Sequence, residues 1–162
     1  MIVMQEKCEI IQMMITYEET LNRLYRDFSK SFPEQKDFWF KLSVEEDAHA
    51  TWVKTLYEKL KQGEVEFADD RIPGDEIKKA LDRFEELTTR MKKEDITLLE
   101  ALELAGEVEN SMLEARFFEF FEGDSDEIHE TFERLGSQTR EHLDRINTVL
   151  NNTKEPLTGK EA

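Results

Sequence analysis

The sequence predicts an all-α protein made of long helices, and its composition supports this fold class. Only six Gly and three Pro occur in 162 residues, which is too few chain-breaking residues for a protein of many strands and turns. Charged residues make up 37% of the chain and hydrophobic residues 38%, a balance typical of helices with one buried and one exposed face. The length suits a single domain.

The first two helices are predicted to form a tightly joined pair. The first spans about residues 5–29 and is followed by the segment SFPE. In that segment Ser31 and Glu34 have the three-residue spacing of a capping box, and the proline between them fits the first turn of a helix. The second helix continues to about Gln62 and is ended by Gly63.

The rest of the chain is predicted to contain a crossover and a second tightly joined pair. Residues 63–74 lack a helical period and therefore connect the two pairs. Asp75 caps a shorter helix, the capping-box pair Thr97 and Glu100 opens the next long helix, and Ser125 caps the last one. These three predicted helices span about residues 75–93, 97–123 and 125–151.

Two tight pairs joined by one long connection is the connectivity of a ferritin-like four-helix bundle, here with an extra shorter helix in the crossover. We expect this bundle to occupy residues 1–151. An up-down bundle and a five-helix array are the alternatives. Residues 152–162 are polar and contain Pro and Gly, so we expect a flexible tail.

Charge and cysteine content narrow the function. The formal net charge of −16 argues against binding to nucleic acid or to an anionic membrane surface, because both require a cationic patch. The single cysteine, Cys8, excludes an internal disulfide and favours a reducing compartment. Charged residues interrupt the apolar start of the chain, so we expect neither a signal peptide nor a membrane span. These features predict a cytoplasmic protein.

The apolar faces of the four long helices are each interrupted by ligand-type residues. We identified the inward faces by taking about 100° of rotation per residue. A buried carboxylate without a partner is strongly disfavoured, so a positive charge is expected among such residues. The interrupting residues, in chain order, are Glu18, Glu46, His49, Glu109 and His142.

The pattern of these residues points to a metal. A Glu from one helix and Glu-x-x-His from the next, each given twice, is the ligand set of di-iron and di-manganese carboxylate bundles. Carboxylate oxygens combined with imidazole nitrogens suit iron or manganese and also accept zinc.

The chain resembles the rubrerythrin-like branch of the ferritin-like superfamily over about residues 5–150. The motifs that carry the resemblance are YEETLNRLY, LSVEEDAHA, ALELAGEVE and TREH. The resemblance implies an iron site of one or two ions that reacts with peroxide or oxygen. Because the chain lacks a CxxC-type iron centre, it also implies an external electron donor. The metal ligands that it implies are Glu18, Glu46, His49, Glu109 and His142.

Two positions depart from the family pattern. Thr139 stands where the family has a glutamate three residues before His142, and Arg116 stands seven residues after Glu109, where a tyrosine follows Glu18. Three carboxylates together with an inward Arg116 balance one divalent ion. We therefore expect an asymmetric site that holds one ion, or that binds a second one weakly. Gln138 is a further source of a ligand oxygen.

Other interpretations of these residues remain open. The bundle is alternatively a degenerate relative without a functional site, acting as a structural or interaction module in which Glu109 pairs with Arg116. An iron-storage cage is a third alternative. Tyr25 is either a core residue or a partner of the metal site. The aromatic run at residues 117–121 is either a homodimer interface or packing against the shorter helix. Glu45 and His129 are expected at the surface.

Overall fold

The computed structural model describes residues 2–64, 75–114 and 126–154, and the regular secondary structure of these ranges is entirely helical. This confirms the all-α prediction for the described part of the chain. The predicted end of one helix at Gly123, Arg116 and the aromatic run at 117–121 lie outside the described residues. The helices are α1 (Ile2–Ser31), the 3-10 helix η1 (Pro33–Gln35), α2 (Lys36–Lys61), α3 (Asp75–Met91), α4 (Leu98–Glu114) and α6 (Asp126–Lys154).

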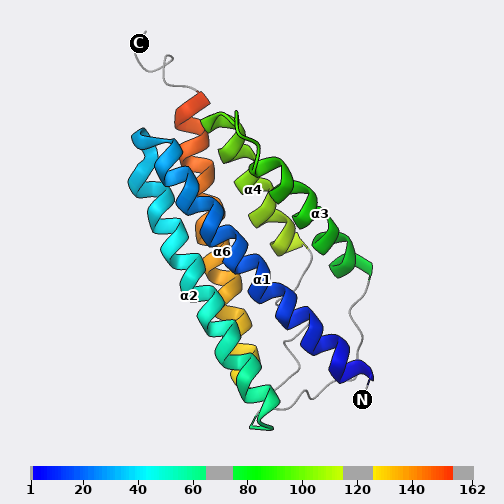
Figure 1. Cartoon of the computed structure of the whole chain (residues 1–162). Helices are drawn as coiled ribbons and strands as arrows, with labels where there is room; N and C mark the ends of the chain where they lie inside the picture. Colours follow the sequence, from blue (N-terminus) through cyan, green and yellow to red (C-terminus); the bar gives the residue numbers. More distant parts are fainter. Residues whose placement is uncertain (1, 65–74, 115–125, 155–162) are drawn as a thin grey trace.

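The long helices pack as two pairs (Figure 1). Helix α1 packs against α2, and α4 packs against α6, while α2 also contacts α6. Helix α3 follows α2 in the chain and packs along α4, with further contacts to α1. Helix α3 therefore lies in the connection between the two pairs, where the sequence predicts the extra helix; α3 and the described part of α4 each have 17 residues.

One of the two predicted capping boxes forms. Thr97 N–H donates to Glu100 Oε2 at 3.2 Å, and Glu100 N–H donates to the Thr97 hydroxyl at 3.1 Å. These reciprocal bonds satisfy backbone donors at the start of α4, which the helix itself leaves unpaired. At the end of α2, Gly63 adopts a left-handed φ of 74°, which ends the helix where the sequence predicts.

The other predicted capping box, at Ser31, is wrong. Helix α1 includes Ser31, and the residue before η1 is Phe32, which makes no side-chain cap. Phe32 N–H instead donates to the carbonyl of Phe28 at 2.9 Å, and the two rings contact at a centroid distance of 5.7 Å. This ring contact, one helical turn apart, favours continuing the first helix through Ser31.

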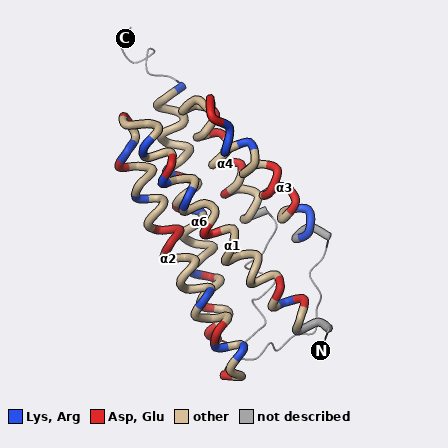
Figure 2. Tube along the Cα trace, viewed as in Figure 1, with Lys and Arg blue, Asp and Glu red and all other residues tan. Residues whose placement is uncertain are grey.

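Each long helix buries the face that its apolar periodicity predicts. Charged residues of both signs are interspersed along the helices (Figure 2). No helix of the described ranges has an apolar stretch that could cross a bilayer. Buried residues of the predicted faces include Ile11, Met14, Leu21, Tyr25, Phe28, Trp39, Leu42, Val53, Leu102, Ala105, Ile128, Phe132, Leu135 and Ile146.

Candidate metal centre

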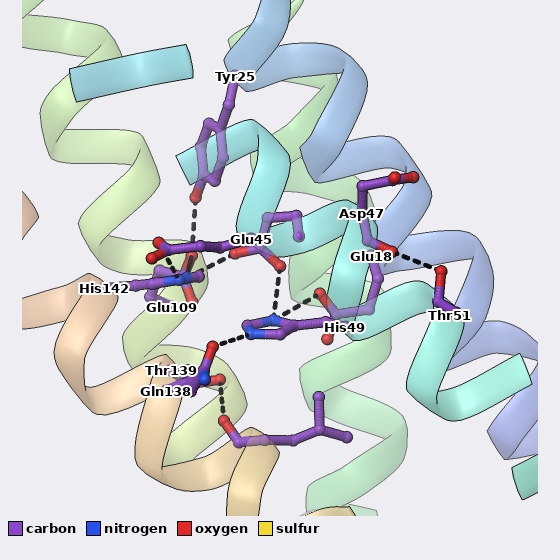
Figure 3. Close-up of polar contacts among 12 residues, drawn as sticks. Glu18, Tyr25, Glu45, Asp47, His49, Thr51, Glu109, Gln138, Thr139 and His142 are labelled. Atoms are coloured by element: carbon purple, nitrogen blue, oxygen red, sulfur yellow. Dashed lines mark hydrogen bonds and ion pairs between the residues drawn. The ribbon is translucent and has the colours of Figure 1, made fainter. Parts of the chain in front are cut away.

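The five predicted ligand residues meet inside the bundle. Figure 3 labels Glu18, His49, Glu109 and His142 among them. Each of the four long helices supplies at least one of them, and all five side chains are buried. They lie on the inward faces because those faces also carry the apolar core residues. The structure thus places the five residues where the periodicity predicts: Glu18 on α1, Glu46 and His49 on α2, Glu109 on α4 and His142 on α6.

Glu46 lies between the two histidines. Its Oε1 is 2.7 Å from Nδ1 of His142, and its Oε2 is 3.2 Å from Nδ1 of His49. The imidazole rings are stacked, with a centroid distance of 5.1 Å and an interplanar angle of 18°. Each of these three residues offers a ligand atom, and the three atoms lie within 4.8 Å of one another.

The contact between Glu46 Oε1 and His142 Nδ1 is short, at 2.7 Å. Glu46 Oε1 and His142 Nδ1 are both buried and have no hydrogen-bond partner among the residues that the structure describes. Buried polar atoms are almost always paired, so an unpaired oxygen and nitrogen that face each other need an explanation. A cation that binds both atoms would satisfy them.

The other two glutamates flank this central group. Glu18 Oε2 is 3.7 Å from Nδ1 of His49, and Glu109 Oε1 is 3.5 Å from Nδ1 of His142. The Tyr25 hydroxyl donates to Glu109 Oε1 at 2.9 Å. Tyr25 is therefore a partner of the site as well as a core residue. Each Nδ1 atom thus faces two carboxylates, one of which is the shared Glu46.

The outer nitrogen of each imidazole also has a partner. Nε2 of His49 lies 2.8 Å from Oε1 of Gln138, and Nε2 of His142 lies 3.1 Å from Oε2 of Glu45. Arg145 pairs with the same Glu45 oxygen. Histidine ligands of metals commonly donate their second N–H to a carboxylate or a carbonyl in this way.

Glu45 corrects a prediction, because it is a partner of the site and not simply a surface residue. Its side chain is 29% exposed and lies against His142, since α2 and α6 are in contact at this level. Gln138 contacts the outer nitrogen of His49 and so does not point its amide at the Nδ1 atoms. A repeated spacing in the sequence points to these two contacts, because Glu45 and Gln138 each stand four residues before a buried histidine.

The carboxylates strongly shift the protonation of the imidazoles. Burial lowers the pKa of His49, but its contacts with Glu18 and Glu46 outweigh this and raise the pKa to about 11. Burial likewise lowers the pKa of His142, while Glu109 and Glu46 raise it to about 10. Both rings are therefore cationic at neutral pH when only protons are available.

Glu18 and Glu46 differ in the direction in which their pKa values move. Burial, followed by the charge of Glu46, raises the pKa of Glu18 to about 8. Burial and Glu109 raise the pKa of Glu46, but interactions with Glu18 and with both imidazoles outweigh them and lower it. Protons on His49, His142 and Glu18 thus supply the positive charge that the cluster needs when no metal binds.

Thr139 takes no part in the cluster. It is buried, and its hydroxyl donates to the carbonyl of Leu135 at 2.8 Å, within its own helix. The position where the family pattern has a sixth ligand, a glutamate, is therefore filled by a side chain whose hydroxyl bonds its own helix.

Residues outside the predicted ligand set complete the surroundings. Trp52 packs its ring 5.3 Å from the ring of His49, and the guanidinium of Arg134 lies 5.1 Å above Trp52.

His129 is paired with Glu133 at 3.3 Å on the outer part of α6, which fits its predicted surface position. Cys8 is partly buried, and burial followed by Glu9 raises its pKa, so its thiol is not activated.

Comparison with known proteins identifies no relative of this chain. The chain matches no protein-family model, no characterised protein and no solved structure. The likeness to the rubrerythrin-like branch therefore rests on the four motifs alone.

Proposed function

We propose that this chain is a ferritin-like, rubrerythrin-like protein that binds a transition-metal ion, iron in the first place, in the centre of its bundle. The observation that carries the proposal is the buried pair of Glu46 Oε1 and His142 Nδ1. These atoms face each other at 2.7 Å without a hydrogen-bond partner in the described ranges. The ligands that we propose are Glu46, His49 and His142, with Glu18 and Glu109 beside them.

The donor set fits the proposed ion. Carboxylate oxygens and imidazole nitrogens suit iron or manganese, and zinc is also compatible. Both histidines present Nδ1 inward while Nε2 has a hydrogen-bond partner, which is the arrangement that orients an imidazole toward a metal. The proposed ligands come from α2 and α6 and the flanking glutamates from α1 and α4, so the packed bundle holds these buried side chains in place.

We propose one tightly bound ion per chain. Among the residues that the structure describes, three carboxylates face the Nδ1 atoms, and Thr139 supplies none. Both histidines contact the same glutamate, Glu46. A second ion would need another carboxylate between the histidines, and Thr139 does not provide one.

An iron ion in this site would supply one-electron redox chemistry and Lewis acidity toward peroxide or oxygen. The residues of the chain would position that ion, and Tyr25 would fix the orientation of Glu109 through its hydrogen bond of 2.9 Å. An external donor would supply the electrons, since the chain has one cysteine and no second metal motif. We place this activity in the cytoplasm, in a homodimer.

A second candidate function is a metal-free structural or interaction module. The observation that favours it is the raised pKa of His49 and of His142, to about 11 and about 10, because two imidazolium cations balance the surrounding carboxylates without a metal. In that case the cluster would hold α2 and α6 together through charge and hydrogen bonds.

Elemental analysis of the purified protein, together with an optical spectrum, distinguishes the two functions. The protein is incubated with Fe²⁺ without oxygen, desalted and analysed, and Glu46→Ala and Glu141→Ala are treated alike. Metal at about one ion per chain in the wild type and in Glu141→Ala, with none in Glu46→Ala, supports the metal site. Glu141 is an exposed carboxylate on α6 and serves as the matched control. Wild-type protein that retains no metal rules the proposal out and favours the structural module. Elution as a small oligomer excludes a storage cage.

A further inference from the structure

The two histidines are held by a reciprocal arrangement between α2 and α6. Glu45 stands four residues before His49, and Gln138 stands four residues before His142. Each of these residues contacts the outer nitrogen of the histidine on the opposite helix: Gln138 reaches His49 and Glu45 reaches His142. Figure 3 shows both contacts on the outer sides of the rings. The two histidines thus have matching outer contacts, each made by a residue of the opposite helix.

The two outer partners differ in charge. Gln138 offers a neutral amide oxygen to His49, whereas Glu45 offers a carboxylate to His142. Arg145 pairs with the carboxylate of Glu45, so the outer partner of His142 belongs to a charged pair. A carboxylate oxygen accepts hydrogen bonds, so Nε2 of His142 donates to it.

This difference in charge between the outer partners affects how strongly the Nδ1 lone pair of each imidazole binds a metal. A hydrogen on Nε2 leaves the Nδ1 lone pair free to point inward, and both outer partners fix this orientation. An anionic partner also draws the N–H hydrogen toward itself and raises the basicity of the ring as a ligand. An amide does so less, because it carries no net charge.

Glu45 acts on the site through His142 and not as a ligand itself. Its Oε2 lies 3.1 Å from Nε2, on the side of the ring opposite to Nδ1. The imidazole therefore stands between Glu45 and the group formed by Glu46 and Glu109. Arg145 pairs with the same carboxylate oxygen and keeps it in place, with side-chain exposures of 31% for Arg145 and 29% for Glu45.

We infer that Glu45, held by Arg145, is a positioning residue that strengthens His142 as a metal ligand more than Gln138 strengthens His49. The inference rests on the proposed metal site and adds an order to its two outer partners. A loss of Glu45 would weaken metal binding through His142, while a loss of Gln138 would remove a neutral partner from His49 and cost less. Moving the carboxylate from position 45 to position 138 would reverse this order.

Titration with Co²⁺ tests this order, because its visible absorption reports both affinity and ligand environment. Glu45→Gln keeps an acceptor oxygen and removes the charge, so we expect affinity to fall about 10-fold or more and the Co²⁺ bands to shift. Gln138→Leu is expected to weaken binding less than Glu45→Gln does. Glu141→Gln is the matched control and should bind as the wild type does. Circular dichroism checks that each variant is folded.

The swapped variant, Glu45→Gln with Gln138→Glu, separates a positioning role from a loss of packing. We expect it to recover most of the affinity lost in Glu45→Gln.

The outcomes distinguish the inference from the function on which it rests. If the wild type binds Co²⁺ but Glu45→Gln binds it equally well, or if Gln138→Leu costs as much as Glu45→Gln, the inference is wrong and the metal site stands. If the wild type binds neither Co²⁺ nor Fe²⁺, the proposed function fails and the inference falls with it.

Discussion

Glu46 Oε1 lies 2.7 Å from Nδ1 of His142 across the contact between α2 and α6, and both atoms are buried without a hydrogen-bond partner in the part of the chain that the structure describes. A carboxylate and an imidazole at this distance attract each other only if a proton or another cation stands between them. The protonation of the site and its affinity for metal are therefore coupled, since both cations compete for the same atoms.

The stability of the metal-free protein should fall as pH rises from about 6.5 to about 9. The folded-state pKa is raised to about 11 for His49, to about 10 for His142 and to about 8 for Glu18. The folded state keeps protons on both imidazoles throughout this range, and on Glu18 up to about pH 8, that the unfolded state releases, so each such group removes up to about 1.4 kcal/mol of stability per pH unit. Urea unfolding at several pH values in the presence of a chelator measures the effect.

The double variant His49→Gln with His142→Gln is the control for this pH dependence. It lacks the two imidazoles, so its stability should depend less on pH over the same range. A wild-type stability that stays constant or rises from about pH 6.5 to about pH 9 would contradict the protonation scheme.

Thr139→Glu should raise the tightly bound metal from one ion to two per chain. It places a carboxylate three residues before His142, as Glu46 stands three residues before His49, and so gives the site a second carboxylate to share. The hydroxyl that is lost bonds only the carbonyl of Leu135 within the same helix. Elemental analysis after loading and desalting gives the stoichiometry.

Thr139→Gln is the matched variant, because glutamine has the length of glutamate without its charge. We expect it to keep one ion per chain. Two ions in the wild type, or one in Thr139→Glu, would show that Thr139 does not set the stoichiometry.

Tyr25→Phe should lower the free energy of unfolding by about 2 kcal/mol, because it removes a hydrogen bond to a buried carboxylate. The Tyr25 hydroxyl donates to Glu109 at 2.9 Å, and Tyr25 is fully buried. Chemical denaturation measures the change. Tyr17→Phe is the control, since the Tyr17 hydroxyl is 3.5 Å from Glu85 in a partly buried position, and it should cost clearly less.

Thr97→Ala should destabilise the protein by about 1 kcal/mol, the usual loss for an N-cap. Thr97 and Glu100 exchange hydrogen bonds of 3.1 and 3.2 Å at the start of α4. Thermal denaturation provides the measurement. Glu100→Gln should retain most of the stability, because glutamine also serves in a capping box. Equal losses in the two variants would argue against the reciprocal cap.

The sequence predicted the burial of the five ligand-type residues well because helical periodicity is a local property. A polar residue on an apolar face, such as Glu18 among Met14 and Leu21, is carried inward when that face packs. The cap at Thr97 was predictable for the same reason, since both partners lie within one helical turn.

The failed predictions concern contacts between helices or rings. Ser31 has the spacing of a cap, but the Phe28 and Phe32 rings pack and α1 continues through it. Glu45 lies beside the inward face of α2, and only the approach of α6 brings His142 and Arg145 to it. Spacing within one helix contains no information on such partners.

The helical class, the inward faces and the five residues that those faces carry are predictable, because each depends on the order of residues within single helices. How these residues meet depends on contacts between helices. Only the packing of α2 against α6 sets Glu46 between His49 and His142, gives His142 a charged outer partner and gives His49 a neutral one. Distances and orientations between helices arise from packing, and the asymmetry of the site is their consequence.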